Sequence, residues 1–169
     1  TSYVGLDASS KLLAIAAQQY SANSWPFPIE WRSGDLLDQP TNQRFDTVCC
    51  IAALHHLPGK NYRQLAAQNL ATWLKPGGYL VVSVWSLWRQ PKYWSKLLAS
   101  LCLSLVGRLE PGDLLFNWGK QKTSGRQRYY HAFSSRELKK LITNTGLNIV
   151  DYQHDGLNYY LVACKTVKS

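Results

Sequence analysis

The sequence predicts an α/β protein whose open, mainly parallel sheet has helices on both faces and ends in an antiparallel hairpin. Strand-like and helix-like segments alternate along the chain, which is typical of a parallel sheet covered by helices. Residues 45–52 and 79–85 are almost continuously apolar, as strands buried on both faces are. The 169 residues, 46% of them hydrophobic, suffice for a real core, so we expect a single domain over 1–169.

The first part of the chain predicts a strand, a helix and a second strand. Residues 3–7 form a short apolar run that ends in a carboxylate, and Ser9 or Ser10 can cap the helical pattern of residues 11–20. Residues 29–33 predict the next strand, because they follow a proline-rich breaker and stop at a glycine-containing turn.

The middle of the chain predicts two buried strands joined by a helix. The apolar run 45–52 is the first strand, and a helix over 61–74 follows it. The Lys-Pro-Gly-Gly sequence at 75–78 ends this helix, and residues 79–85 form the second strand.

The last part predicts two helices and a hairpin. An apolar helix extends from Pro91 to about residue 106, and the basic, glycine-bearing stretch 107–128 is interpreted as an insertion or loop. Ser134 and Glu137 have the spacing of a capping box, which opens a helix ending at Gly146. Two strands, 148–152 and 159–165, then close the sheet as an antiparallel hairpin around a turn at 154–156.

Composition restricts the class of protein. The apolar run 97–106 is far shorter than the roughly 20 residues that a membrane-spanning helix requires, so we expect no membrane segment. The four cysteines show no CxxC pair and no zinc-ligand spacing, which predicts buried thiols, no metal and a reducing, cytoplasmic environment; they are Cys49, Cys50, Cys102 and Cys164.

Positive charge is concentrated in one segment. The net charge is +9, and residues 86–140 carry 11 basic and 3 acidic side chains. Concentrated positive charge attracts polyanions because it neutralises phosphates and releases their counterions. RNA is the partner that this pattern favours, while an anionic membrane surface or simple solubility remain alternatives.

Several polar residues follow predicted strands directly. Ligands of open α/β sheets bind outside the carboxyl ends of the strands. Asp7, the turn Gly34-Asp35 and the segment 52–56 all lie at such ends. A carboxylate there can accept both hydroxyls of a ribose, and a second one can accept an adenine amino group.

The order of these motifs resembles that of class I S-adenosylmethionine-dependent methyltransferases. Asp7, Gly34-Asp35, Phe45-Asp46 and the Leu-Lys-Pro-Gly-Gly turn at 74–78 occur in that family's sequence. The resemblance implies an open, Rossmann-like methyltransferase sheet and S-adenosyl-L-methionine as cofactor. It implies cofactor contacts from Asp7, Asp35, Leu36 and Ala52.

The family's first motif, a strand with a glycine loop, does not occur in the chain. That strand is central in the family's sheet, between the strands that correspond to residues 3–7 and 45–52. Methionine is also absent from the chain, including position 1. We therefore expect an N-terminally truncated domain that lacks the first, central strand and binds the cofactor poorly.

A narrower resemblance is to the tRNA wobble-uridine carboxymethyl methyltransferases. It rests on residues 51–56, the strand 81–85, the Arg-Tyr-Tyr-His sequence at 128–131 before Glu137-Leu138, and Asn158-Tyr-Tyr. The resemblance implies methylation of the carboxylate of 5-carboxymethyluridine in a tRNA anticodon arm. The family's eukaryotic members work with a small zinc-binding activator protein, which is therefore a possible partner.

The chemistry of such a reaction assigns roles to the candidate residues. The attacking carboxylate is already ionised at pH 7, so positioning matters more than a strong base. We expect catalytic contacts from His56, Arg128 and His131, and substrate contacts from Trp85, Tyr129, Tyr130 and Asn158. The structural alternatives are that the tyrosines and Trp85 belong to the core and that one of the adjacent histidines, His55 or His56, points away.

Two other functions fit the same sequence. A methyltransferase for a small molecule would share the fold but would not need the basic segment 86–140. A non-catalytic RNA-binding protein could retain the fold without the cofactor loop.

Overall fold

A computed structural model describes residues 1–20, 25–38, 42–107, 109–117 and 127–167. The chain divides into two compact units, Thr1–Asn42 and Gln43–Ser169, which are described separately below. That both form one domain, with an insertion at 107–128, stays a prediction.

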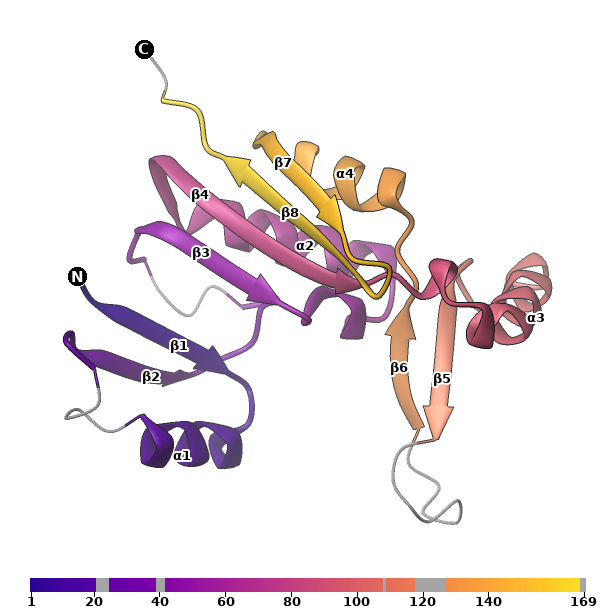
Figure 1. Cartoon of the computed structure of the whole chain (residues 1–169), viewed down its shortest axis with the longest axis horizontal. Coiled ribbons are helices and arrows are strands. Elements are labelled where there is room, and N and C mark those ends of the chain that lie inside the picture. Colours follow the sequence, from indigo (N-terminus) through magenta and orange to yellow (C-terminus); the bar gives the residue numbers. More distant parts are fainter. Residues whose placement is uncertain (21–24, 39–41, 108, 118–126, 168–169) are drawn as a thin grey trace. The chain divides into compact units, whose positions relative to one another are not determined.

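The first unit is a parallel strand pair with one helix (Figure 1). β1 (Tyr3–Asp7) pairs in parallel with β2 (Ile29–Ser33), and α1 (Ser10–Gln19) connects them. Ser9 caps α1, because its side chain accepts a hydrogen bond from the backbone N–H of Leu12. These elements confirm the strand, helix and strand predicted from this part of the sequence.

The second unit contains a four-stranded mixed sheet in the order β3-β4-β8-β7. β3 (Phe45–Ile51) and β4 (Leu74–Trp85) are parallel, whereas β8 (Asn158–Cys164) runs antiparallel to β4 and to β7 (Asn148–His154). The closing antiparallel hairpin is thereby confirmed. Among the described strands, β1 pairs only with β2 and β3 only with β4, so a missing central strand stays a prediction.

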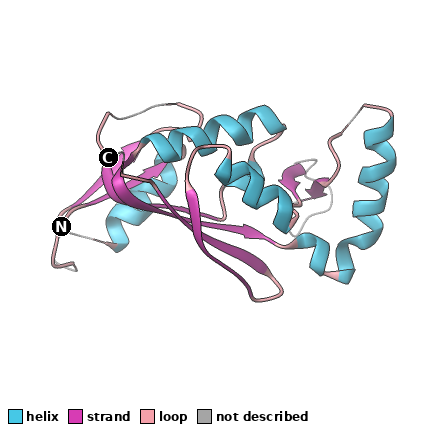
Figure 2. Ribbon diagram, turned by 90° about the horizontal axis from the view of Figure 1, so that it is seen from above, coloured by secondary structure: helices cyan, strands magenta, loops and turns pink. Residues whose placement is uncertain are grey.

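Two helices cover one face of this sheet (Figure 2). α2 (Lys60–Thr72) contacts β4, α4 (Ser135–Thr143) contacts β7 and β8, and the two helices contact each other. Beneath them the strands bury alternate apolar side chains, such as Val48, Leu80, Val82, Val84 and Leu161. Within this unit, the expected burial of these strands on both faces is found only in part, at Val82, Ser83 and Val84 of β4.

The other face of the sheet exposes side chains at the alternate positions. Ile51 and Tyr79 are 59% and 47% exposed. In β8, Tyr160 also points to this exposed face, because its neighbour Leu161 points to the buried face. Cys50 is buried but Cys49 is exposed, as is Cys102 elsewhere in the unit, so the prediction of four buried thiols was wrong for these two. A continuous apolar run cannot show which of its two faces the fold covers.

The Lys-Pro-Gly-Gly sequence lies inside β4, not in a turn before it. A β-carbon on Gly78 would approach the carbonyl oxygens of Asp46, Lys75 and Phe45 to between 2.9 and 3.1 Å. Lys75 forms a salt bridge with Asp46 across the strand pair at 2.9 Å. The glycine therefore allows β3 and β4 to approach closely where their register shifts.

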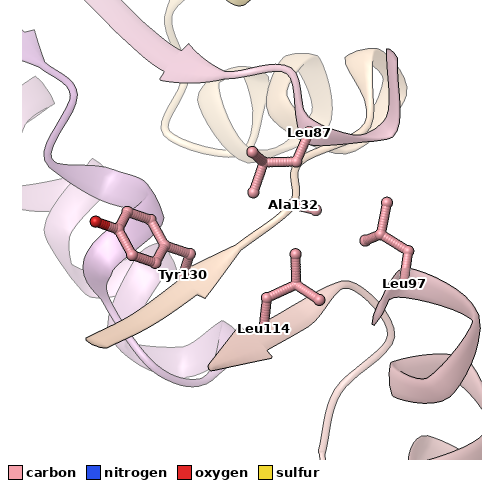
Figure 3. Packing of buried hydrophobic residues seen from close by; sticks show 5 residues of the cluster. All are labelled: Leu87, Leu97, Leu114, Tyr130 and Ala132. Carbon is pink, nitrogen blue, oxygen red and sulfur yellow. The ribbon is translucent and has the colours of Figure 1, made fainter. Parts of the chain in front are cut away.

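Beyond the sheet, a helix and a second hairpin share a small core. α3 (Trp94–Leu105) confirms the predicted apolar helix, and β5 (Asp113–Asn117) pairs antiparallel with β6 (Gln127–His131). The stretch interpreted as an insertion or loop thus contains a strand and the start of another, while residues 108 and 118–126 lie outside the described residues. Figure 3 shows the buried cluster beside β6, formed by Leu87, Leu97, Leu114, Tyr130 and Ala132.

None of the helices in the described ranges is both long enough and apolar enough to span a bilayer.

Candidate active site

Two carboxylates lie at the carboxyl ends of the strands of the first unit. Asp7 is opposite Ser33 in the β1–β2 register, and Asp35 follows two residues later. One Asp7 oxygen accepts the N–H of Ser9 at 2.7 Å, and one Asp35 oxygen accepts the N–H of Leu37 at 2.9 Å. Within the described residues the second oxygen of each carboxylate accepts no hydrogen bond, so both can receive hydroxyl or amino donors.

The surroundings of Asp7 provide space for a ligand. A hollow of about 240 Å³ between β1 and α1 has Asp7, Leu12 and Trp31 among its walls. Leu36, the third cofactor residue predicted in this unit, lies in the turn between Asp35 and Leu37. The structure therefore brings Asp7, Asp35 and Leu36 together at one strand edge.

Ala52 follows β3 in an unusual backbone conformation. Its φ of 52° is the one positive value of a non-glycine residue among those described. Its N–H donates to the carbonyl oxygen of Ser83 at 3.0 Å and lies 3.1 Å from the Ser83 hydroxyl. Such backbone strain costs about 1–3 kcal/mol and clusters at functional sites, which supports the prediction that Ala52 borders a ligand.

The adjacent histidines in the short 3₁₀ helix Leu54–His56 have different environments. His55 is fully buried, and its Nδ1 lies 3.3 Å from the backbone N–H of Trp85, so Nδ1 is the acceptor. Burial, with a smaller contribution from His56, lowers the pKa of His55 to about 3, which keeps its ring neutral. The His55 Nε2 atom is buried and has no partner in the described part of the chain.

His56 is exposed and faces strand β6. Its Nδ1 lies 3.4 Å from the backbone carbonyl oxygen of Tyr129. Burial lowers the pKa of His56, the Tyr129 carbonyl opposes this shift, and the positive charge of Arg128 adds to it. His56 therefore contacts the backbone of the residue that follows Arg128, another of the three predicted catalytic residues.

An aromatic cluster connects His56 to the sheet. Trp85 and Tyr130 stack with ring centroids 4.9 Å apart and an interplanar angle of 12°. The Tyr130 ring also lies 4.6 Å from that of His56, and His55 lies 4.9 Å from Trp85. Tyr130 is only 2% exposed, so in this structure it supports the cluster from within, as the core alternative for this tyrosine expects.

Tyr129 and His131 point to the opposite side of β6, into a set of charged groups. We call this set the β6 charge network; it consists of Arg63, Glu110, Asp113, Tyr129, His131 and Glu137. Its members come from α2, the segment before β5, β5 and β6 themselves, and α4. The network thereby ties the β5–β6 hairpin to both helices that cover the sheet.

Arg63 and Glu110 form one end of the network. Arg63 is 2% exposed, and its guanidinium donates to the Glu110 carboxylate, to the Tyr129 hydroxyl at 3.1 Å and to the Leu57 carbonyl at 3.2 Å. Glu110 also accepts the N–H of Lys60, the first residue of α2, at 2.9 Å. Burial opposes ionisation of Glu110, but the Lys60 N–H and Arg63 hold its pKa below the usual range.

His131 and its carboxylates form the other end. His131 is 1% exposed; its Nδ1 lies 2.8 Å from Asp113 and its Nε2 lies 2.8 Å from Glu137. Burial alone would lower the pKa of His131, but the bonds to Asp113 and Glu137 raise it overall. Because both ring nitrogens are engaged and enclosed, His131 does not reach a substrate in this structure, and its predicted catalytic role requires another explanation.

Asn158 lies near the site but is engaged locally. It pairs with Trp85 in the β4–β8 register. Its side-chain amide donates to Asp155 at 3.4 Å and to the Tyr160 hydroxyl at 3.3 Å. Hydrogen bonds from the backbone of residues 157 and 158 lower the pKa of Asp155 to about 2, so this carboxylate anchors the β7–β8 turn.

Sequence reasoning missed Arg63, Glu110 and Asp113. The available signal was the presence of Glu110 and Asp113 in an otherwise basic segment that leads to the alternating Tyr129 and His131. Ligand atoms of Glu110, Asp113 and His131 lie within 4.8 Å of one another, as in a metal site. However, Arg63 and Tyr129 already pair with these carboxylates, which accounts for the cluster without a cation.

Comparisons with known proteins show what the chain is similar to. Residues 1–80 match the model of a family described as a methyltransferase domain. A putative methyltransferase of Encephalitozoon cuniculi is 28% identical over 120 residues, which are 70% of this chain and 52% of the relative. The tRNA (carboxymethyluridine(34)-5-O)-methyltransferase of Schizosaccharomyces pombe is 28% identical over 183 residues, covering 96% of this chain and 72% of the relative. The chain thus spans about half the length of the first relative.

Solved structures share the fold. A Methanosarcina mazei S-adenosylmethionine-dependent methyltransferase aligns with a TM-score of 0.78 and 19% identity over 99% of this chain and 83% of that one. A Clostridium acetobutylicum S-adenosylmethionine-dependent methyltransferase aligns with a TM-score of 0.69 and 12% identity, covering 98% of this chain and 84% of that one.

The residues at the strand ends fit the family's cofactor. The available oxygens of Asp7 and Asp35 are suited to a nucleoside's hydroxyl and amino groups, and neither carboxylate forms a salt bridge within the described residues. The match over residues 1–80 and the shared fold identify a class I S-adenosylmethionine-dependent methyltransferase domain.

Proposed function

We propose that the chain methylates the carboxylate of 5-carboxymethyluridine at the wobble position of tRNA. The name of the Schizosaccharomyces pombe relative, which aligns with 96% of the chain, supports this substrate. The Arg-Tyr-Tyr-His sequence of β6 supports it too, because Arg128 directly precedes Tyr129, whose carbonyl oxygen lies 3.4 Å from His56, in the strand that also supplies Tyr130 to the aromatic cluster. A cytoplasmic location and a zinc-binding activator protein remain part of this proposal.

One observation carries the choice of RNA as substrate. All three acidic residues of segment 86–140 belong to the β6 charge network, where Arg63, Tyr129 and His131 bind them. The described basic residues of the segment are mostly exposed instead: Arg89, Lys92, Lys96, Arg128, Arg136 and Lys140. Because these acids are bound within the network, the exposed arginines and lysines outnumber them at the surface of this segment, which favours binding of a polyanion.

The side chains have defined tasks in this reaction. When bound, S-adenosylmethionine supplies a methyl group activated on a sulfonium. Asp7 and Asp35 would bind the nucleoside part, and the Arg128 guanidinium would hold the acceptor carboxylate by paired hydrogen bonds. The acceptor is already ionised at neutral pH, so no residue of the chain needs to remove a proton from it.

Binding of tRNA at increasing salt tests the choice of substrate class. Replacing both Lys92 and Lys96 with alanine should reduce the salt slope by about 0.7 for each lost phosphate contact. Lys75→Ala is the matched control, because this lysine pairs with Asp46 on the sheet and lies outside the basic segment. Binding that does not depend on salt would contradict the proposal and favour a small-molecule substrate.

Methylation of a tRNA that carries 5-carboxymethyluridine tests the reaction itself. Arg128→Ala should reduce turnover by at least about 100-fold, because the acceptor carboxylate loses its orienting partner. Lys75→Ala, which lies outside the basic segment, should leave turnover unchanged. Unchanged kinetics of Arg128→Ala would remove this arginine from the site.

A further inference from the structure

We infer that His131 is a positioning residue whose doubly protonated ring, bound between Asp113 and Glu137, fixes strand β6 so that Arg128 meets the acceptor. This inference rests on the proposed function for the role of Arg128. The two bonds of the His131 ring, to Asp113 and to Glu137, are called the His131 clamp below. The protonation state of the ring and the presence of this clamp can be measured without any activity.

The first argument comes from the two ring nitrogens. Both lie 2.8 Å from a carboxylate oxygen, Nδ1 from Asp113 and Nε2 from Glu137. A neutral imidazole has one N–H, so it would place the lone pair of its other nitrogen against a carboxylate. Only the imidazolium donates to both, which makes the protonated ring the form that this geometry selects.

The second argument is the charge around the ring. The titratable and charged groups near His131 are Asp113 from β5, Glu137 from α4, Arg63 from α2 and Tyr129 from β6, with Glu110 behind Arg63. When His131 is protonated, it and Arg63 together face the three carboxylates of the network. When His131 is neutral, Arg63 is the one cation of the network that faces these three carboxylates. Burial and Arg63 counteract protonation, but Asp113 and Glu137 outweigh them and raise the pKa of His131.

The third argument connects the network to the site. Side chains alternate along β6, so Tyr129 and His131 enter the network while Arg128 and Tyr130 lie on the opposite side. The carbonyl of Tyr129 lies 3.4 Å from His56, and Tyr130 stacks on Trp85. Any shift of β6 on loss of the network therefore moves Arg128 relative to His56 and the aromatic cluster.

The direction of the pH dependence follows. Because the pKa of His131 is raised on folding, the clamp is complete below the ring's ordinary pKa and is lost as pH rises through the raised value. Methylation should therefore decline at alkaline pH even though the acceptor carboxylate remains ionised.

The test uses Glu137→Gln in the full chain. Glutamine removes the negative charge but keeps an oxygen that can accept from Nε2, so this ring nitrogen retains an acceptor. The His131 ring is followed by ¹⁵N NMR; we expect both nitrogens protonated at neutral pH and a titration midpoint that is lower by about one unit in Glu137→Gln. Glu30→Gln is the matched control, because Glu30 pairs with Arg32 in the first unit.

Activity completes the test. In Glu137→Gln the alkaline limb of the methylation profile should shift by the same amount as the ring's midpoint, with a higher KM for tRNA and an unchanged KM for the cofactor. A singly protonated His131 ring at neutral pH, or a midpoint unaffected by Glu137→Gln, overturns the inference. A shifted midpoint with an unshifted alkaline limb also overturns it, whereas absence of any tRNA methylation by the unmodified chain at a saturating cofactor concentration counts against the proposed function.

Discussion

Arg63 provides the strongest test of the β6 charge network. In Arg63→Met the buried stem keeps most of its volume, but the guanidinium and its bonds to Glu110, Tyr129 and Leu57 are lost. Removing one partner of a buried ion pair typically destabilises a protein by about 3–5 kcal/mol. Arg63 is 2% exposed but the Glu110 and Glu137 side chains are 40% and 39% exposed, so water can partly solvate them. We therefore expect the free energy of unfolding to fall by about 3 kcal/mol, near the lower end of this range.

Urea unfolding followed by tryptophan fluorescence measures this loss. The double variant Arg63→Met, Glu110→Gln should recover about 1–2 kcal/mol, because it also removes the carboxylate that the single variant leaves without its cation. Arg136→Met on the exposed surface of α4 is the control and should change stability by less than about 0.5 kcal/mol. If Arg63→Met costs less than about 1 kcal/mol, then Arg63 does not hold the network together.

Four further changes test other parts of the structure. Ser134→Ala removes the cap that accepts the N–H of Glu137 and should cost about 1 kcal/mol in thermal unfolding; an unchanged midpoint would contradict the cap. Gly78→Ala should cost about 1–3 kcal/mol, because carbonyl oxygens of β3 and β4 crowd the new methyl group; normal stability would contradict that close approach. Asp7→Ala should weaken binding of S-adenosylmethionine at least about tenfold in calorimetry, and equal affinity would exclude this carboxylate from the site. The free energy of unfolding should fall as pH rises through the raised pKa of His131, whereas a flat profile would show that folding does not raise this pKa.

Much of the fold could be predicted because local signals and tertiary structure agree. The strands Tyr3–Asp7 and Ile29–Ser33 have the predicted bounds, and the capping serines Ser9 and Ser134 mark their helices correctly. The hairpin β5–β6 was missed because its first strand follows glycine and proline in a basic stretch that has no clear alternation. Its stability comes from Leu114 packing on Leu87 and Leu97, which are distant in sequence.

The candidate site also has one part that the sequence predicts and another part that it does not. Positions at strand ends, such as Asp7 and Asp35, follow from the order of elements, since the carboxyl ends of parallel strands meet at one edge. The roles of the histidines could not be predicted, because burial and partners distinguish them and neither is encoded locally. His55 became the enclosed neutral ring, His56 the exposed one, and His131 the ring between two carboxylates.

The alternation along β6 leaves the hairpin a single acceptable alignment. If β6 slipped by one residue against β5, Arg128 and Tyr130 would enter the compartment of Asp113 and Arg63, and His131 would face the ring of Trp85. The Tyr130 ring would then replace a hydrogen-bonding side chain in the β6 charge network. The charged His131 would replace Tyr130 as the stacking partner of Trp85. The short strand Gln127–His131 is thus held in place from two sides, by salt bridges on one and by ring stacking on the other.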